Sequence, residues 1–130
     1  MECQWPLNQQ ELQAVLDTEK VDVCLVSETH FTKQSYIKFG GYKVYHTIHP
    51  ESSARGGSAV TINENIHHYE ETKYETEGIQ ATAVRIRARN CSIVVAGIYF
   101  PPKHPLKKYK YLEFLGDLGK RFIVGAILMP

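Results

Sequence analysis

Residues 21–30 read Val21-Asp22-Val23-Cys24-Leu25-Val26-Ser27-Glu28-Thr29-His30. A short apolar run of this kind predicts a buried strand, and the carboxylate of Glu28 follows directly after it. In layered α/β proteins, functional side chains gather where strands end, because a strand holds them rigidly beside a crevice. Glu28 is therefore the first candidate site residue. The alternative is an exposed acid at a strand end that binds no metal.

The rest of the chain predicts helices and strands in an order that favours an α/β or α+β fold over an all-β fold. Helices are expected over 10–17 and between 105 and 119, the second with Tyr111, Leu115 and Leu118 on one face. A charged loop is expected between 62 and 80. Strands are expected at 21–26, 43–46, 58–62, 80–87, 92–99 and 121–124.

Composition excludes several classes of protein. A chain of 130 residues suits one domain, and a net charge of +1 gives no broad basic field for nucleic acid. Three cysteines without a C-x-x-C pair favour a reducing compartment, and Cys24 and Cys91 are expected in the core. No secretory signal or membrane-length apolar run is found, which predicts an intracellular protein of the nucleus or cytoplasm, neither secreted nor in a membrane. The six histidines lack metal-ligand spacing.

Two further stretches carry candidate residues. Gly56-Gly57 permits a tight turn or a close approach between strands, and Arg55 before it either contacts a phosphate or is solvated. Tyr99 ends an apolar strand that the following prolines terminate. It is either a site residue or a half-buried aromatic side chain at the strand end. A basic cluster follows and is either a solvated loop or a nucleic-acid surface. It consists of Lys103, Lys107, Lys108 and Lys110.

Several strings, in this order, resemble the endonuclease/exonuclease/phosphatase superfamily. They are VDVCLVSETHFT, GGYKVYHT, RGGSAVTI, IQATAVRI, IVVAGIYFPP and FLGDLGKRFIVG, spread from about Glu11 to Val124. In particular, the chain resembles the apurinic-endonuclease-like domain of non-LTR (Jockey-type) retrotransposon polyproteins.

The resemblance implies a four-layer α/β sandwich of the deoxyribonuclease/apurinic-endonuclease type that cleaves phosphodiester bonds in DNA with Mg²⁺. By this resemblance, Glu28 matches the carboxylate that ligates the metal. Tyr99 matches a catalytic tyrosine whose hydroxyl reaches the scissile phosphate. Arg55 and Lys103 are the expected nucleic-acid contacts.

The chain departs from the family pattern in two places. Pro6 stands where the family has an asparagine, and Ala126-Ile127-Leu128 follows Gly125 where the family has Gly-Asp-x-Asn. We therefore expect residues 1–130 to be a single partial domain, truncated at its C-terminus. Such an incomplete sandwich is expected to leave an inner apolar face uncovered, to be marginally stable, and to show no measurable cleavage.

Three functions remain open from the sequence. The first is a retroelement nuclease that hydrolyses phosphodiester bonds in target DNA. The second is an inert remnant of a retroelement reverse-transcriptase polyprotein. The third is a non-catalytic module that binds nucleic acid or protein through the lysines between Lys103 and Lys110.

Overall fold

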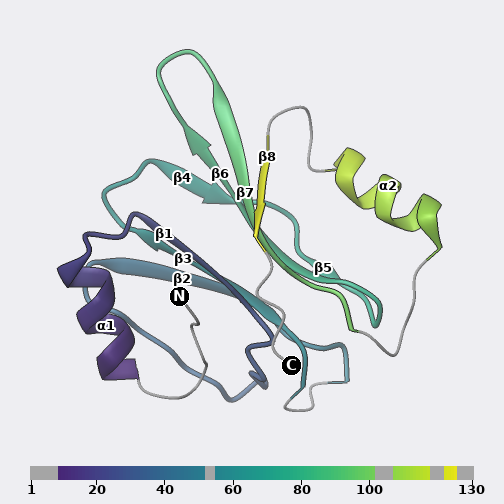
Figure 1. The fold of residues 1–130 in the computed structure, drawn as a ribbon, viewed down its shortest axis with the longest axis horizontal. Helices are drawn as coiled ribbons and strands as arrows, with labels where there is room; N and C mark the ends of the chain where they lie inside the picture. Colours follow the sequence, from purple (N-terminus) through teal and green to yellow (C-terminus); the bar gives the residue numbers. More distant parts are fainter. Residues whose placement is uncertain (1–8, 52–54, 102–106, 118–121, 126–130) are drawn as a thin grey trace.

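The computed structural model describes residues 9–51, 55–101, 107–117 and 122–125 (Figure 1). Within these residues the chain forms two α-helices and eight β-strands. Helix α1 (Gln9–Thr18) precedes the first strand, and helix α2 (Lys108–Asp117) precedes the last one. Neither described helix is long and apolar enough to cross a membrane.

Three strands form the first sheet, which we call sheet A. They are β1 (Val23–Ser27), β2 (Tyr42–Thr47) and β3 (Ser58–Asn63). Their spatial order is β1-β3-β2, and both neighbouring pairs are antiparallel. The end of β1 therefore lies beside the start of β3, where Ser27 pairs with Ser58. Glu28 and the Gly56-Gly57 pair follow and precede these strands at the same edge of sheet A.

Five strands form the second sheet, which we call sheet B. They are β4 (His68–Glu70), β5 (Tyr74–Glu75), β6 (Gln80–Arg87), β7 (Ser92–Tyr99) and β8 (Phe122–Gly125). The order is β4-β6-β7-β8, with β5 also paired to β6, and only β7 and β8 are parallel. Because β6 and β7 are antiparallel, Gln80 at the start of β6 pairs with Tyr99 at the end of β7.

The elements form four layers in the order α1, sheet A, sheet B, α2. Figure 1 shows α1 beside sheet A and α2 on the other side of the molecule, beside sheet B. Leu16 of α1 packs with Val26 and Ala59 on the outer face of sheet A. Phe114 of α2 packs on Ala83 and its neighbours on the outer face of sheet B. The expected α/β fold class and its four-layer arrangement are therefore confirmed.

The two sheets pack face to face over a third apolar cluster. Val60 and Ile62 of β3 meet Val84 of β6 and Val95 of β7, and each is buried. The expectation that an inner apolar face lies uncovered is wrong for this part of the molecule, because both sheets of the sandwich lie within the described residues.

One close backbone approach and one set of hydrogen bonds fix how the sheets meet. A Cβ atom on Gly97 of β7 would lie 2.7 Å from the backbone oxygen of Ala59, so the two backbones approach closely there. Thr82 of β6 donates a hydrogen bond to Thr47 Oγ1 of β2 at 2.8 Å, and its Oγ1 lies 3.0 Å from Ser58 Oγ of β3. All three hydroxyl-bearing residues are fully buried. Hydrogen bonds satisfy these hydroxyls across the interface between the sheets, so their burial is not costly.

Three details of the sequence interpretation are wrong. The expected apolar face of α2 left out Phe114, which is the buried residue of this helix; Leu115 is exposed, and Leu118 lies outside the described residues. Cys91, which was expected in the core, is exposed between β6 and β7, whereas Cys24 on β1 is partly buried and packs against the core as expected. The charged loop between 62 and 80 contains the short strands β4 and β5.

Candidate functional site

The candidate site lies at the edge where β1 ends, β3 begins, β6 begins and β7 ends. Glu28 adopts a left-handed backbone conformation with φ 59°, and so does His30 with φ 58°. Non-glycine residues rarely adopt this conformation because it costs about 1 kcal/mol or more. Backbone hydrogen bonds hold it here: Glu28 N–H donates to Gly57 O at 2.7 Å, and His30 N–H donates to Gly56 O at 2.9 Å.

The glycine pair is required at this edge. Gly56 and Gly57 both have positive φ, 59° and 88°. A Cβ atom on Gly57 would lie 2.6 Å from Thr29 Oγ1 and 3.0 Å from Thr47 O. Of the two interpretations of this pair, the close backbone approach is therefore confirmed, and the pair holds the Glu28 loop.

The carboxylate of Glu28 is only partly paired. Its side chain is 19% exposed, and its Oε1 lies 3.6 Å from His30 Nε2. Its Oε2 is buried and has no hydrogen-bond partner among the described residues. A buried carboxylate oxygen without a donor is costly, and a cation or an ordered water satisfies it. The chemistry of this oxygen therefore fits a divalent cation.

The rest of a metal-binding set is not found in the part of the chain that the structure describes. No group of three or more His, Cys, Asp or Glu side chains there is placed to hold a metal ion. Within these residues, an ion bound to Glu28 would therefore have fewer than three ligands of these types and would keep several waters.

Tyr99 shares the site with Glu28. Its side chain is 9% exposed, and its ring carbons Cδ2 and Cε2 would lie 3.4 Å from a Cβ atom on Gly56. Burial raises the pKa of the Tyr99 hydroxyl above its ordinary value, and the nearby negative charge of Glu28 raises it further. The hydroxyl is therefore protonated, and able to donate a hydrogen bond, at neutral pH.

Of the two predicted nucleic-acid contacts, the structure describes Arg55 only. Arg55 is described and exposed, directly before the glycine pair, and its guanidinium forms an ion pair with Glu51. Exposed ion pairs of this kind contribute little stability and are readily exchanged, so the guanidinium is accessible to an anion. Lys103 lies outside the described residues.

Sequence reasoning missed Gln80, which is fully buried at this edge. Its Oε1 accepts a hydrogen bond from Gly57 N–H at 3.2 Å, and its Nε2 donates to Thr76 O at 2.6 Å. The sequence signal that could have identified it is a glutamine inside an apolar run. A buried amide is tolerated only when its hydrogen bonds are made, so such a glutamine indicates a structural hydrogen-bonding role.

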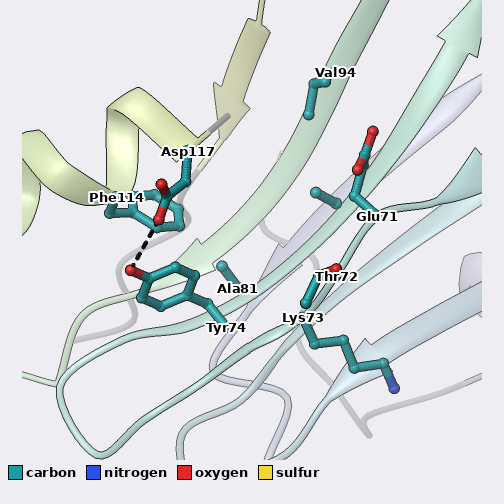
Figure 2. Close-up of a pocket in the computed structure, with 9 residues that line it drawn as sticks. Glu71, Thr72, Lys73, Tyr74, Ala81, Val94, Phe114 and Asp117 are labelled. Carbon is teal, nitrogen blue, oxygen red and sulfur yellow. Dashed lines mark hydrogen bonds between the residues drawn. The ribbon is translucent and has the colours of Figure 1, made fainter. Parts of the chain in front are cut away.

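A cavity of about 260 Å³ lies away from this site, on the outer face of sheet B beneath α2. Figure 2 shows Tyr74, Phe114 and Asp117 on one side of it and Glu71 and Thr72 on the other. Tyr74 OH donates to Asp117 Oδ2 at 3.2 Å. The cavity contains neither Glu28 nor Tyr99, so it is not the predicted site.

We expect Glu28→Gln to lower the pKa of Tyr99, because the substitution removes a negative charge that disfavours the phenolate. Burial is the larger cause, so the pKa stays above its ordinary value of 10.0. NMR titration of the assigned Tyr99 Cζ signal measures both effects. Since the folded-state pKa is raised, the stability contributed by protonated Tyr99 is complete below pH 10 and is lost as pH rises through that raised pKa. An unchanged Tyr99 titration in Glu28→Gln would show that the two side chains do not interact.

No protein-family profile matches the chain. The chain is 33% identical over 117 residues to the "RNA-directed DNA polymerase from mobile element jockey" of Drosophila melanogaster, and 29% identical over 117 residues to that of Drosophila funebris. These matches cover 90% of this chain but 13% of each relative. The "Probable RNA-directed DNA polymerase from transposon BS" of Drosophila melanogaster is 26% identical over 110 residues, 83% of this chain and 12% of its own length.

A solved structure has the same fold. The endonuclease domain of TRAS1, described as a telomere-specific non-LTR retrotransposon, superposes with a TM-score of 0.67 at 24% identity. The match covers 93% of this chain and 54% of that domain. The chain is therefore related in sequence to Jockey-type mobile-element polyproteins and has the fold of a non-LTR retrotransposon endonuclease domain, as its motifs predict.

Proposed function

We propose that this chain supplies the Glu28–Tyr99 part of a DNA endonuclease domain, in which Glu28 binds a divalent cation and Tyr99 binds a phosphate of the DNA. The observation that carries the proposal is the buried, unpartnered Oε2 of Glu28 at the strand edge that Tyr99 shares. The fold of a retrotransposon endonuclease domain supports phosphodiester cleavage as the activity of the complete domain.

Glu28 is suited to a hard cation such as Mg²⁺, which prefers carboxylate oxygens and retains bound waters. When bound, such an ion polarises a phosphoryl oxygen and lowers the pKa of a coordinated water. The left-handed conformation at Glu28 and the bonds to Gly57 and Gly56 fix the backbone that carries the carboxylate before any ion arrives. This preorganisation reduces the entropy lost on binding.

Tyr99 is suited to a phosphate oxygen. Its hydroxyl keeps its proton at neutral pH, because burial and Glu28 both raise its pKa. A protonated phenol donates a hydrogen bond to an anionic oxygen, and such charge-assisted bonds are stronger than neutral ones. Arg55, exposed at the same edge, is the nearby described cation that an approaching phosphate would meet.

Cleavage by the 130-residue chain alone is not part of the proposal. Hydrolysis needs a group that deprotonates water, and Ala126-Ile127-Leu128 stand where the resembling family has the Asp and Asn for this step. General acid–base groups contribute about 10²–10⁴-fold to rate, so their loss removes most activity. We therefore propose cation and phosphate binding without measurable nicking.

The test uses Mn²⁺ as the probe, with binding followed by paramagnetic broadening of NMR signals. Changes that only support a metal ligand cost about 10–100-fold in affinity, so loss of the ligand itself in Glu28→Gln is expected to cost at least about 100-fold. Glu64→Gln, at an exposed glutamate after the far end of β3, is the matched control and is expected to leave binding unchanged. Equal Mn²⁺ affinity in Glu28→Gln and wild type would contradict the proposal.

Incubation with supercoiled plasmid and Mg²⁺ tests the remaining part. We expect the wild-type chain to nick no more than Glu28→Gln does. If wild type nicks the plasmid and Glu28→Gln abolishes the nicking, this chain cleaves DNA by itself. The proposal that it binds without measurable nicking would then be wrong.

A further inference from the structure

The side chain of Gln80 connects the parts of the candidate site. Gln80 begins β6, pairs in register with Tyr99 of β7, and is fully buried. Its side chain faces sheet A, on the same side of β6 as Thr82 and Val84. All of its described side-chain hydrogen bonds go to backbone atoms, so its amide serves to place main chain.

These bonds join three segments. Gln80 Oε1 accepts from Gly57 N–H at 3.2 Å, which ties sheet B to the turn before β3. Its Nε2 donates to Thr76 O at 2.6 Å and to Glu77 O at 3.3 Å, which fixes the amide from the other side. The turn that carries Thr76 is itself closed by a hydrogen bond from Ile79 N–H to Thr76 Oγ1 at 3.0 Å. Gln80 is therefore held in one orientation.

The Gly56-Gly57 pair lies between Gln80 and the two site residues, Glu28 and Tyr99. Gly57 O accepts the N–H of Glu28 at 2.7 Å, so a single residue, Gly57, links the Gln80 amide to the Glu28 backbone. A Cβ atom on Gly56 would lie 2.5 Å from Gln80 Oε1 and 3.4 Å from the Tyr99 ring, so Gly56 packs closely against both side chains. Gln80 is thus the cross-strand neighbour of Tyr99, and two hydrogen bonds through Gly57 link it to the Glu28 loop.

We propose that Gln80 is a positioning residue that sets the placement of the Glu28 carboxylate relative to the Tyr99 hydroxyl, by holding the Gly56-Gly57 turn between them. The inference rests on the proposed function only in that the site so arranged binds a cation. Gln80 touches neither cation nor phosphate and acts through the backbone.

Gln80→Met tests the proposal, because methionine has a similar length and makes none of the three hydrogen bonds. Losses of supporting groups behind a metal ligand cost about 10–100-fold in affinity, and we expect Mn²⁺ binding to weaken by that factor. The matched control is Tyr42→Phe. The Tyr42 hydroxyl lies 3.0 Å from Leu16 O and 2.7 Å from Val21 O, at the opposite end of β2. Distant sites act independently, so this control is expected to change Mn²⁺ affinity by less than about twofold while also lowering the melting temperature.

A second measurement needs no metal. Glu28→Gln is introduced in wild type and in Gln80→Met, and the resulting decrease in the Tyr99 pKa is compared by NMR titration. Positioning by Gln80 predicts a clearly smaller decrease in the Gln80→Met background. A role in stability alone predicts a lower melting temperature with an unchanged decrease and unchanged Mn²⁺ affinity, and that result would overturn the proposal.

The two proposals fail in different ways. If wild type binds no Mn²⁺, the proposed function fails, and the Tyr99 titration alone decides the role of Gln80. If Gln80→Met does not fold, Gln80→Asn replaces it, because asparagine keeps a polar amide that is one methylene too short to reach Gly57 N–H. An unchanged Tyr99 response in Gln80→Asn would equally overturn the positioning role.

Discussion

Gly97→Ala is expected to lower the free energy of unfolding by about 3 kcal/mol, because overpacking a filled interior typically costs up to that amount. The added Cβ would lie 2.7 Å from Ala59 O and 3.4 Å from Val26 O, both backbone atoms of sheet A. Neither oxygen belongs to a flexible side chain, so the sheets must separate locally. The restriction of the unfolded chain by alanine gains about 0.4–1 kcal/mol, which is too little to offset this cost.

Urea unfolding followed by far-ultraviolet circular dichroism measures this effect. Gly116→Ala is the matched control, since a Cβ on Gly116 of α2 would meet nothing within 4 Å. Alanine in an exposed helical position is favoured over glycine by about 0.5–1 kcal/mol, so the control is expected to stabilise the protein. A Gly97→Ala protein as stable as wild type would show that β7 does not approach sheet A as closely as the structure indicates.

Phe114→Ala is expected to cost about 3–5 kcal/mol, the usual range for deleting a buried phenylalanine. Phe114 is 1% exposed and is the buried residue of α2. Its ring packs edge-to-face on Tyr74, with centroids 5.0 Å apart, and on Phe100 at 6.2 Å. Without it α2 loses its main contact with sheet B, so faster amide exchange is expected in α2 as well as lower overall stability.

Leu112→Ala on the same helix is the control, because Leu112 is 58% exposed. Exposed substitutions usually change stability by less than about 0.5 kcal/mol. Equal losses for Phe114→Ala and Leu112→Ala would contradict the assignment of the buried face of α2.

Apolar patterning predicted the long strands and both helices, because the spacing of apolar side chains in these segments indicates which type of element they form. β7 and the buried part of β6 are rich in apolar residues, and α1 carries Leu12, Val15 and Leu16 at helical spacing. β4 and β5 carry no such pattern. They form by pairing with β6. Next to this pairing, Glu71 Oε1 lies 2.5 Å from Arg85 Nε of β6. A local sequence pattern does not show that Glu71 has a partner 14 residues further along the chain.

The face of α2 was ambiguous for a similar reason. Tyr111, Phe114, Leu115 and Leu118 all fit one broad apolar stripe, and the sequence does not choose between adjacent positions within it. The ring contacts of Phe114 with Tyr74 and Phe100 make that choice in the folded protein.

The candidate site was predictable where a residue ends a strand and unpredictable where it acts through the main chain. Glu28 and Tyr99 follow from strand ends together with the family resemblance, and the structure places them together. Their roles in metal and phosphate binding stay predictions. Gln80 and the left-handed turn at Glu28 depend on contacts between β1, β3 and β6, which only the three-dimensional arrangement reveals.

The buried hydroxyls of Thr47, Ser58 and Thr82 have a consequence for the site. An interface of hydrocarbon alone tolerates a small lateral slip, whereas directional bonds weaken steeply when their donors and acceptors are displaced. Thr82 bonds across to Thr47 and adjoins Ser58 next to the edge where Glu28 and Tyr99 lie. Glu28 follows a strand of sheet A, and Tyr99 ends a strand of sheet B. The hydrogen bonds of these hydroxyls therefore keep the two sheets, and the two site residues that they carry, in a fixed lateral alignment.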